Sequence, residues 1–496
     1  MPTNVVNVDL ESQTGAVSQR TYSDLLVVAN NPTAADPTYN HPLVYDDPTQ
    51  VANEFGDGSD AHIASEEIAA RGTESWWVVM LESSSHTEII TDSDTTSVDE
   101  GTVQNTPMRG GTDNITITVD GTDQTLEPTV KSPPDKPGES GVTAINTDTG
   151  ELKAGSSTSG SGAGIEVDYE TLSWDNSFPE MNAGSFDIAC LADTRADRSY
   201  IGEVDEIVSW AEDNESAVVL AYGNGADYDS DEMAMDAAHD VGGYVPSGRV
   251  LPIAHKSNDD VSAAIAGRLA TKVPWFNPYM DGSASYNFSM TEYRRATIGA
   301  PANPGTFEGG DDNGAGPANV LYTEMGTQIL SNSVSTAGAD SNYQFFDVAR
   351  TESFIVSEVK RALRSLRLSR DYVPFAPVGR TLIEAAIRKR LNQYVAPSGR
   401  ALSPEELSNL RQEVDQRNTD DNPDNDVDNP EQILREENRR NTGHANVPLS
   451  ELEIQVPRFD DLSETARANR VWRDIEVKAR LAGNAHTFNV ELAVQV

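Results

Sequence analysis

Apolar and polar residues alternate at both ends of the chain. Near the amino end the apolar positions are Val6, Val8 and Leu10, with Asn7 and Asp9 among the polar ones. Near the carboxyl end the apolar positions of the same alternation are Phe488, Val490, Leu492 and Val494. A period of two is typical of a β-strand with one apolar face. We therefore expect a strand at each end, and we expect both to pair between subunits.

Short apolar runs alternate with helical patterns in residues 24–81 and 176–345. Buried strands are predicted at 24–30, 73–81, 186–193, 217–222 and 249–255. Amphipathic segments such as 60–72 lie between them and favour helices. This alternation is typical of a largely parallel sheet covered by helices. We expect these two stretches to form one α/β core, preceded by an extended arm at 1–23.

Residues 82–175 differ in composition from the segments on either side. They are rich in threonine and β-branched residues and are interrupted by glycine, proline and aspartate. Asp120 and Gly121 between two short β-patterns predict a tight hairpin turn. Because the α/β pattern resumes afterwards, residues 82–175 are expected to form an inserted β-rich domain on the outer surface.

Residues 346–496 predict a C-terminal α+β domain. One amphipathic helix is expected after Thr351, its possible N-cap, and a second at 380–395. A polar helix at 403–416 leads into an acidic loop at 417–431. Strands are expected at 451–456 and 474–481. The last of these could also form a hairpin with the final strand by turning at Gly483 and Asn484.

The charge balance narrows the class of protein. The formal net charge is −44, from 80 acidic and 36 basic residues, and the hydrophobic fraction is 37%. Such a surface suits very high salt, where the Debye length falls to about 3 Å and like charges hardly repel. An acidic disordered chain is the other interpretation, but the regular strand and helix patterns speak against it. Duplex nucleic acid is not an expected partner.

The sequence offers no convincing catalytic, cofactor or metal site. The glycines of 222–228 and 160–164 lack the context of a phosphate-binding loop. Asp424, Asp426 and Asp428 have Ca²⁺-loop spacing, but Asn429 and Arg435 occupy positions that need Gly and Glu. The single cysteine excludes an internal disulfide. We expect a protein without enzyme activity or cofactor, with no export signal and no membrane insertion.

Basic residues gather in one window of this acidic chain. The window is 356–390 and also contains Arg380 and Lys389. The residues expected to form the contact are Lys360, Arg361, Arg364, Arg367, Arg370, Arg388 and Arg390. A solvated helix face would not predict this excess. We expect this basic patch to contact an acidic surface, either of another copy or of a partner.

Several motifs, taken in order, resemble those of contractile-tail sheath proteins. They are an Asp-x-x-Arg strand end at Asp347–Arg350, a long helix, and a Pro-x-x-x-x-Gly at Pro374–Gly379 before another helix. A Leu-Ala-Gly-x-x-His turn follows at Leu481–His486, before the last strand. Residues 142–155 resemble the inserted β-region of these proteins. The likeness is good over 340–496 and diffuse before that.

The resemblance implies a tail sheath subunit of a virus infecting a halophilic archaeon. Such subunits form stacked rings around an inner tail tube, and their contraction drives the tube through the host envelope for genome ejection. The implied partners are further copies, the inner tail tube protein, and baseplate and tail-terminator proteins, with assembly in the host cytoplasm and a final place in the virion. Cell-encoded injection devices use the same subunit type. The alternatives are a baseplate or adhesion component, or an extracellular halophilic α/β hydrolase.

Overall fold

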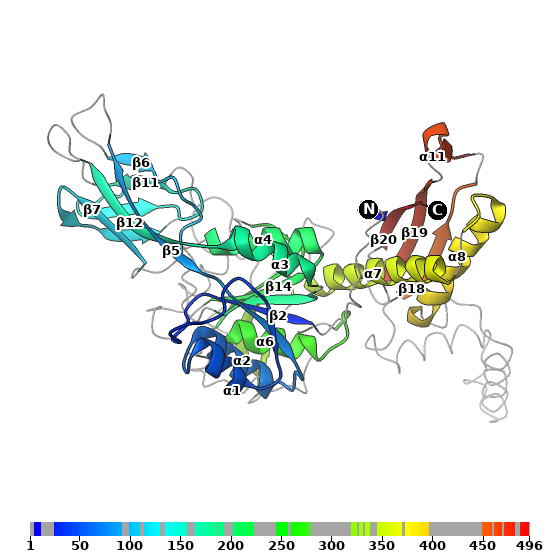
Figure 1. The fold of residues 1–496 in the computed structure, drawn as a ribbon, viewed down its shortest axis with the longest axis horizontal. Coiled ribbons are helices and arrows are strands. Elements are labelled where there is room, and N and C mark those ends of the chain that lie inside the picture. Colours follow the sequence, from blue (N-terminus) through cyan, green and yellow to red (C-terminus); the bar gives the residue numbers. More distant parts are fainter. Residues whose placement is uncertain are drawn as a thin grey trace, which may run out of the picture. The chain divides into compact units, whose positions relative to one another are not determined.

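A computed structural model describes most of the α/β and C-terminal elements of the chain. The chain divides into two compact units, Met1–Val17 with Thr351–Val496 and Ser18–Arg350 (Figure 1). No helix among the described residues is long and apolar enough to cross a membrane. The described residues are 4–10, 24–91, 99–109, 114–128, 134–155, 164–184, 186–192, 202–222, 245–255, 259–276, 278, 319–324, 327–330, 333–337, 345–369, 373–395, 449–458, 461–468, 471–481 and 487–495.

The larger unit is built on an eight-stranded sheet with the order β17-β16-β15-β14-β13-β2-β4-β3. Pairing is parallel from β4 to β16, and β3 and β17 are antiparallel at the two edges. The mixed α/β class expected from the sequence is confirmed. The strands are β2 Leu25–Ala29, β3 Leu43–Tyr45, β4 Trp76–Met80, β13 Ile188–Leu191, β14 Ala217–Tyr222, β15 Val250–Ala254, β16 Asn319–Glu324 and β17 Thr327–Leu330.

Helices cover both faces of this sheet. Leu25, Val27 and Ala29 of β2 pack in one core with α1 (Pro48–Phe55), α2 (Asp60–Ala70) and α6 (Val261–Ala270). Leu26 and Val28 pack on the other side with α3 (Trp174–Ala183) and α4 (Gly202–Asn214). Strands that are buried on both faces are apolar throughout, which is why these runs show no alternation. Helices α1 and α3 and strands β3, β16 and β17 were not predicted from the sequence.

Residues 83–172 form two four-stranded sheets within the same unit. Their orders are β6-β11-β10-β9 and β5-β12-β7-β8, and the two sheets share one apolar core. Asp120 and Gly121 have φ of 52° and 74° and connect β7 to β8, so the predicted hairpin turn is confirmed. The strands are β5 Ser83–Ile90, β6 Glu100–Thr102, β7 Ile115–Val119, β8 Thr122–Asp123, β9 Thr125–Pro128, β10 Val142–Ile145, β11 Glu151–Ala154 and β12 Ile165–Leu172.

The smaller unit combines helices with one four-stranded sheet. Its helices are α7 (Phe346–Leu368), α8 (Pro377–Leu391), the short 3₁₀ turn Asn392–Tyr394 and α11 (Glu464–Ala468). The boundary between the two units falls inside α7. The predicted helix 403–416, the acidic loop 417–431 and the Gly483–Asn484 turn lie outside the described residues.

The start of α7 corrects two predictions. The helix begins at Phe346, so Thr351 is a buried residue inside the helix and not its N-cap. The Asp347–Arg350 motif belongs to the first helical turns and not to the end of a strand. The reason is tertiary: Phe346, Val348 and Ala349 are buried, which extends the apolar face of the helix back to its first turn.

The carboxyl of Asp347, in the first turn of α7, is buried, and its burial can be tested through the pH dependence of stability. Burial raises the pKa of its carboxyl to about 6, although Ser333 Oγ donates a hydrogen bond to it at 3.3 Å. The folded state therefore holds this proton more tightly than the unfolded chain, whose Asp pKa is about 3.9. The resulting stability is present below about pH 4 and is lost as the pH rises through about 6.

We expect Asp347→Asn to raise the free energy of unfolding at pH 7.5 by about 1–2 kcal/mol, because the amide carries no charge to desolvate. The gain should shrink on acidification and vanish near pH 4. Denaturant unfolding at pH 4, 6 and 7.5 measures it. A gain of the same size at all three pH values would contradict the raised pKa of the Asp347 carboxyl.

Candidate assembly interface

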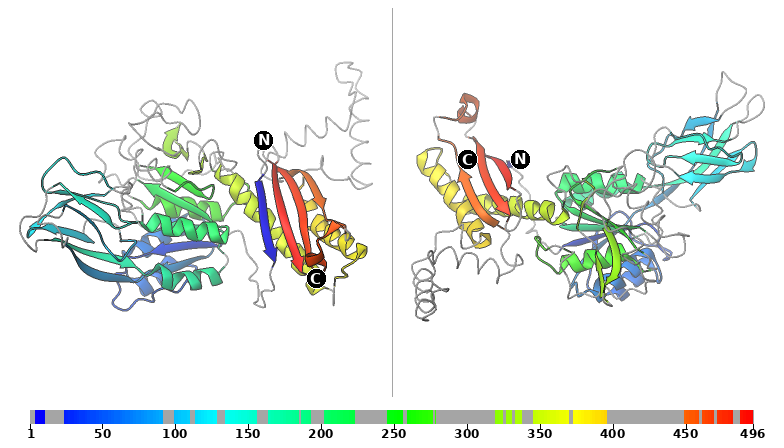
Figure 2. Two further views of the ribbon diagram at one scale, coloured as in Figure 1. Left: turned by 90° about the horizontal axis from the view of Figure 1, so that it is seen from above. Right: turned by 180° about the vertical axis from the view of Figure 1, so that it is seen from behind.

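The first and last strands of the chain lie next to each other in the sheet of the smaller unit. Its order is β1-β20-β19-β18, with β1 (Asn4–Leu10), β20 (Thr487–Gln495), β19 (Val471–Leu481) and β18 (Leu449–Gln455). Strand β20 is antiparallel to β19 and parallel to β1. Figure 2 shows the blue amino-terminal strand beside the red carboxyl-terminal ones.

The register matches the apolar positions predicted for the two terminal strands. Val6, Val8 and Leu10 pair with Val490, Leu492 and Val494. On the other side of β20, Phe488, Val490 and Leu492 pair with Ala479, Val477 and Ile475. The side chains of β1 and β20 are outside what the structure describes, whereas Ile475, Val477 and Ala479 are fully buried. The final strand is therefore paired on both of its edges within one chain.

Helix α8 and strand β19 show why this sheet has a stable apolar face. Ile383, Ile387 and Leu391 recur at helical spacing and are all buried. Trp472 of β19 is fully buried, and Phe375 packs on it edge to face at 5.1 Å between ring centroids. The register between β19 and β20 shifts between Trp472 and Ile475. The described side chains of α8 and β19 thus form an apolar core beside this sheet.

Two members of the basic patch turn toward one buried carboxylate. Glu358 of α7 is almost completely buried, with 1% of its side chain exposed. Arg361 Nη1 lies 2.9 Å from Glu358 Oε1, and Arg390 Nη2 of α8 donates to the same oxygen at 3.0 Å. The Tyr394 hydroxyl donates to Glu358 Oε2 at 3.0 Å. This Glu358 cluster joins α7 to the end of α8.

Glu358 also alters the electrostatics of its neighbours. Burial and the carboxylate charge together raise the pKa of Tyr394 to about 12. The hydrogen bond that Arg390 donates to the Glu358 carboxylate raises the pKa of Arg390. The sequence carried a signal for this cluster, because Glu358 is one of few acids within the basic window. That signal was not used in the sequence analysis above.

The remaining members of the basic patch differ in exposure. Arg388 pairs with Glu384 one turn away at 3.2 Å, with both side chains partly exposed. Lys360 and Arg364 are half-buried, and Arg367 is exposed beside Leu368, which is 78% exposed. Arg370 lies outside the described residues. Arg367 is thus the member of the patch, among those that the structure describes, best placed for an external contact.

An ion pair that the sequence analysis missed holds the start of α7 to the central sheet. Arg350 Nη2 donates to Asp187 Oδ2 at 2.6 Å and Arg350 Nε donates to the same oxygen at 3.2 Å. Only 1% of each side chain is exposed. Asp187 directly precedes β13, and its carbonyl accepts from the Ala217 amide of β14. The Asp-x-x-Arg motif named Arg350 but gave no indication of its partner, 163 residues away.

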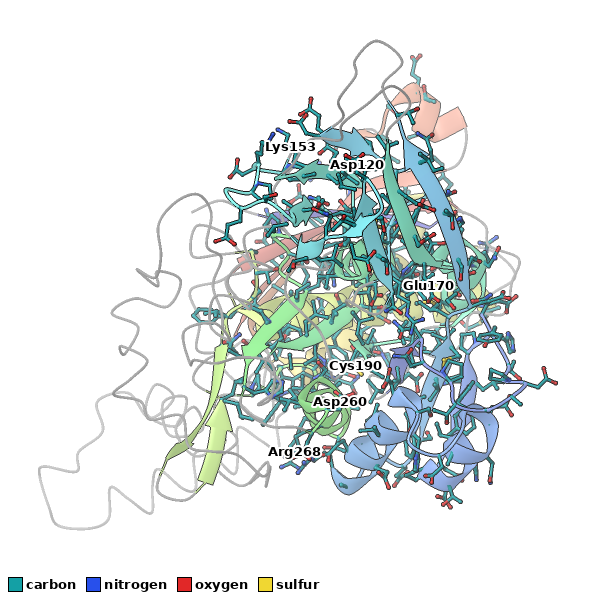
Figure 3. All side chains as sticks on the ribbon, turned by 90° about the vertical axis from the view of Figure 1, so that its left-hand side faces the viewer. Asp120, Lys153, Glu170, Cys190, Asp260 and Arg268 are labelled. Atoms are coloured by element: carbon teal, nitrogen blue, oxygen red, sulfur yellow. The ribbon has the colours of Figure 1, made fainter. Side chains whose placement is uncertain are left out.

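The described residues can be compared with the needs of a metal site and of a reactive thiol. No group of three His, Cys, Asp or Glu side chains among them could hold a metal ion. Cys190 is fully buried, and burial together with the nearby Asp260 raises the pKa of its thiol (Figure 3). A thiol of this kind is a poor nucleophile.

Comparison with known proteins gives structural neighbours and no sequence match. No protein-family profile and no curated protein matches the sequence. A sheath tail protein from Listeria innocua is 10% identical, covers 95% of this chain and 94% of its own, and has a TM-score of 0.45. A sheath tail protein from Desulfitobacterium hafniense is 11% identical, with coverage of 98% and 100% and a TM-score of 0.44. The contracted sheath complex of the extracellular contractile injection system PVC is 8% identical, with coverage of 95% and 94% and a TM-score of 0.46.

Proposed function

We propose that this chain is a structural subunit of a contractile tail sheath and forms stacked rings around an inner tail tube. The observation that carries the proposal is the terminal sheet. Its edge pair is formed by strands from opposite ends of the sequence, in a register that matches their apolar alternation. A polymer can use such a sheet as a joint, because backbone hydrogen bonds provide affinity and alternate side chains provide specificity.

The same hydrogen bonds form whether the strands come from one chain or from several. Residues 11–23 separate β1 from the α/β core and are mostly polar. Exchange of identical strands between copies needs no new contacts, and so it is a low-cost route to assembly. In the proposed sheath, β1 and β20 fill the sheets of neighbouring subunits.

Contraction would be a switch between two lattices of the same subunit. Small free-energy differences at each interface, summed over the polymer, would supply the work without a cofactor. The further partners proposed are the inner tail tube, baseplate and tail-terminator proteins of a virus of a halophilic host. The exposed Arg367, with Arg364, is proposed to contact an acidic surface in this assembly.

Negative-stain microscopy of the purified protein at high salt tests the sheath assignment. Tubes or helical sleeves are the expected result. Isolated discs or trimers would favour a baseplate or adhesion component of the same particle. A protein that stays monomeric under all polymerising conditions would contradict the sheath proposal.

Disulfide trapping separates strand exchange from pairing within one chain. Val8 and Leu492 are partners in the parallel β1–β20 register, so Val8→Cys with Leu492→Cys should form a disulfide on oxidation. Exchange that brings β1 of one copy and β20 of another into the same sheet predicts a ladder of covalent multimers on a denaturing gel, because each bond then joins two copies. Val8→Cys with Glu491→Cys is the matched control, since successive residues of a strand point to opposite faces. Cross-linked monomers alone, taken from assembled tubes, would contradict exchange.

A further inference from the structure

The carboxyl edge of the eight-stranded sheet has a topological switch point beside β2. The chain passes from β2 to β4 on one side and later places β13 on the other side. Open α/β sheets usually bind their ligands at such a point, just beyond the carboxyl ends of the strands. Asn30 and Asn31 directly follow β2 at this place. Asn30 Nδ2 donates to Glu203 Oε2 in the first turn of α4, at 3.5 Å.

An arginine from the inserted sheets reaches this position. Arg109 has 10% of its side chain exposed, and its Nη1 lies 2.5 Å from Glu170 Oε2 of β12. Its Nη2 donates to Asn31 Oδ1. The Arg109 amide also donates to the Glu170 carbonyl at 2.8 Å. Glu170 lies near the core end of β12, whereas Asp120 and Lys153 lie farther out (Figure 3). One guanidinium therefore joins the inserted sheets to the switch point.

The covalent connection between the two parts is a two-stranded ribbon. Strands β5 and β12 pair from Ser83 with Leu172 to Ile90 with Ile165, so the chain leaves and re-enters the core at adjacent residues. The ribbon is anchored by the Ser173 amide, which donates to the Glu82 carbonyl at 2.9 Å. A ribbon anchored at one end can bend or twist about that end. A second contact between the inserted sheets and the core, besides the Ser173–Glu82 hydrogen bond, is what would fix its direction.

Like charges oppose that second contact. The pKa of Asp205 in α4 is raised by burial and by Asp148, which lies in the turn between β10 and β11. Glu206 has a raised pKa for the same two kinds of reason. The inserted sheets thus bring a carboxylate toward an acidic helix start, and the interaction is repulsive unless salt screens it.

We propose that Arg109 is a latch that holds the inserted sheets on the α/β core at the switch point. The latch has two parts: Glu170 orients the guanidinium from within the inserted sheets, and Asn31 receives it from the core. Enzymes with this sheet architecture usually bind a ligand at the switch point. In this protein the inserted sheets contact the core there. Released from Asn31, the insert swings on the β5–β12 ribbon while both parts remain folded.

Distance measurement between two spin labels tests the latch in the full-length protein. The labels are placed by Glu166→Cys on β12 and Asp213→Cys near the end of α4, both at exposed positions, while the native Cys190 is buried. The parent should give one narrow distance distribution. Arg109→Met and Asn31→Leu should each replace it by a broad one. Lys153→Met is the matched control, because Lys153 pairs with Glu100 inside the inserted sheets at 3.7 Å and should leave the narrow peak unchanged.

The two variants approach the same contact from opposite sides, so their comparison is decisive. If Arg109→Met broadens the distribution and Asn31→Leu does not, Arg109 only orders Glu170 and the latch is wrong. A narrow distribution in both variants would also overturn it. Thermal melting followed by circular dichroism identifies a variant that fails to fold, and Asn31→Leu, which changes no residue of the inserted sheets, then carries the test.

Discussion

Arg350→Met should lower the free energy of unfolding of the larger unit by about 3–5 kcal/mol. The substitution keeps most of the side-chain volume but leaves the Asp187 carboxylate buried without its guanidinium. Removing one member of a buried ion pair is costly, because the other charge keeps its desolvation penalty and loses its compensation. Asp187 is followed directly by β13, at the centre of the sheet, so the damage should spread to the whole core.

The measurement is denaturant unfolding of the full-length protein at high salt, with hydrogen exchange at β13 to assign the transition to the larger unit. Lys136→Met is the matched control, because Lys136 pairs with Asp99 at 2.5 Å with both side chains largely exposed. Such a pair is worth about 0–1 kcal/mol. Adding Asp187→Leu to Arg350→Met should recover part of the loss, since no buried charge then remains. Equal losses for Arg350→Met and Lys136→Met would refute the buried pair as an anchor.

Glu358→Gln is expected to cost the smaller unit about 1.5–3 kcal/mol, the range for hydrogen bonds to a charged group. The amide keeps the shape of the side chain and one acceptor oxygen, but it removes the charge that Arg361 and Arg390 share. Both guanidiniums are about one third exposed, so water compensates part of the loss. Glu384→Gln is the matched control, because its pair with Arg388 is a more exposed one-turn pair. Its loss should stay below about 1 kcal/mol.

The pH dependence separates a charge effect from a packing effect in Glu358→Gln. In the parent, Tyr394 has a pKa of about 12, above the ordinary value of about 10. Its contribution to stability is therefore complete below about pH 10 and is lost as the pH rises toward 12. Glu358→Gln removes the carboxylate charge, so this loss should become smaller. Unfolding curves at pH 8 and pH 11 measure this loss. If the difference in unfolding free energy between parent and variant is the same at both pH values, the Glu358 charge does not raise the pKa of Tyr394.

The Glu358 cluster also changes how the basic patch must be tested. Replacing Arg361 by Glu would place a second carboxylate beside a buried one and could unfold the smaller unit. A failure of assembly would then say nothing about an external contact. Arg367 is the informative position, because its side chain is exposed near the end of α7. This distinction could not be drawn from the sequence, in which all seven basic residues are equivalent.

The amino-acid sequence by itself determined the features that depend on neighbours along the chain. The period of two at β1 and β20, the apolar runs of the central strands and the Asp120–Gly121 turn were all readable. Strand, helix and turn geometry imposes these patterns over a few residues, whatever the rest of the fold does. The resemblance to sheath proteins rests on such local motifs in a fixed order.

Only the tertiary structure decided which distant segments meet. It placed β1 parallel to β20, paired Arg350 with Asp187, turned Arg361 and Arg390 toward Glu358, and brought Arg109 to Asn31. It also extended α7 back to Phe346, against the local indication of a cap at Thr351. A buried charged group loses its contacts with water, so it needs a partner in a geometry that satisfies the hydrogen bonds of both groups. That geometry is set by the packing of the whole core, and a pattern over a few residues contains no information about it.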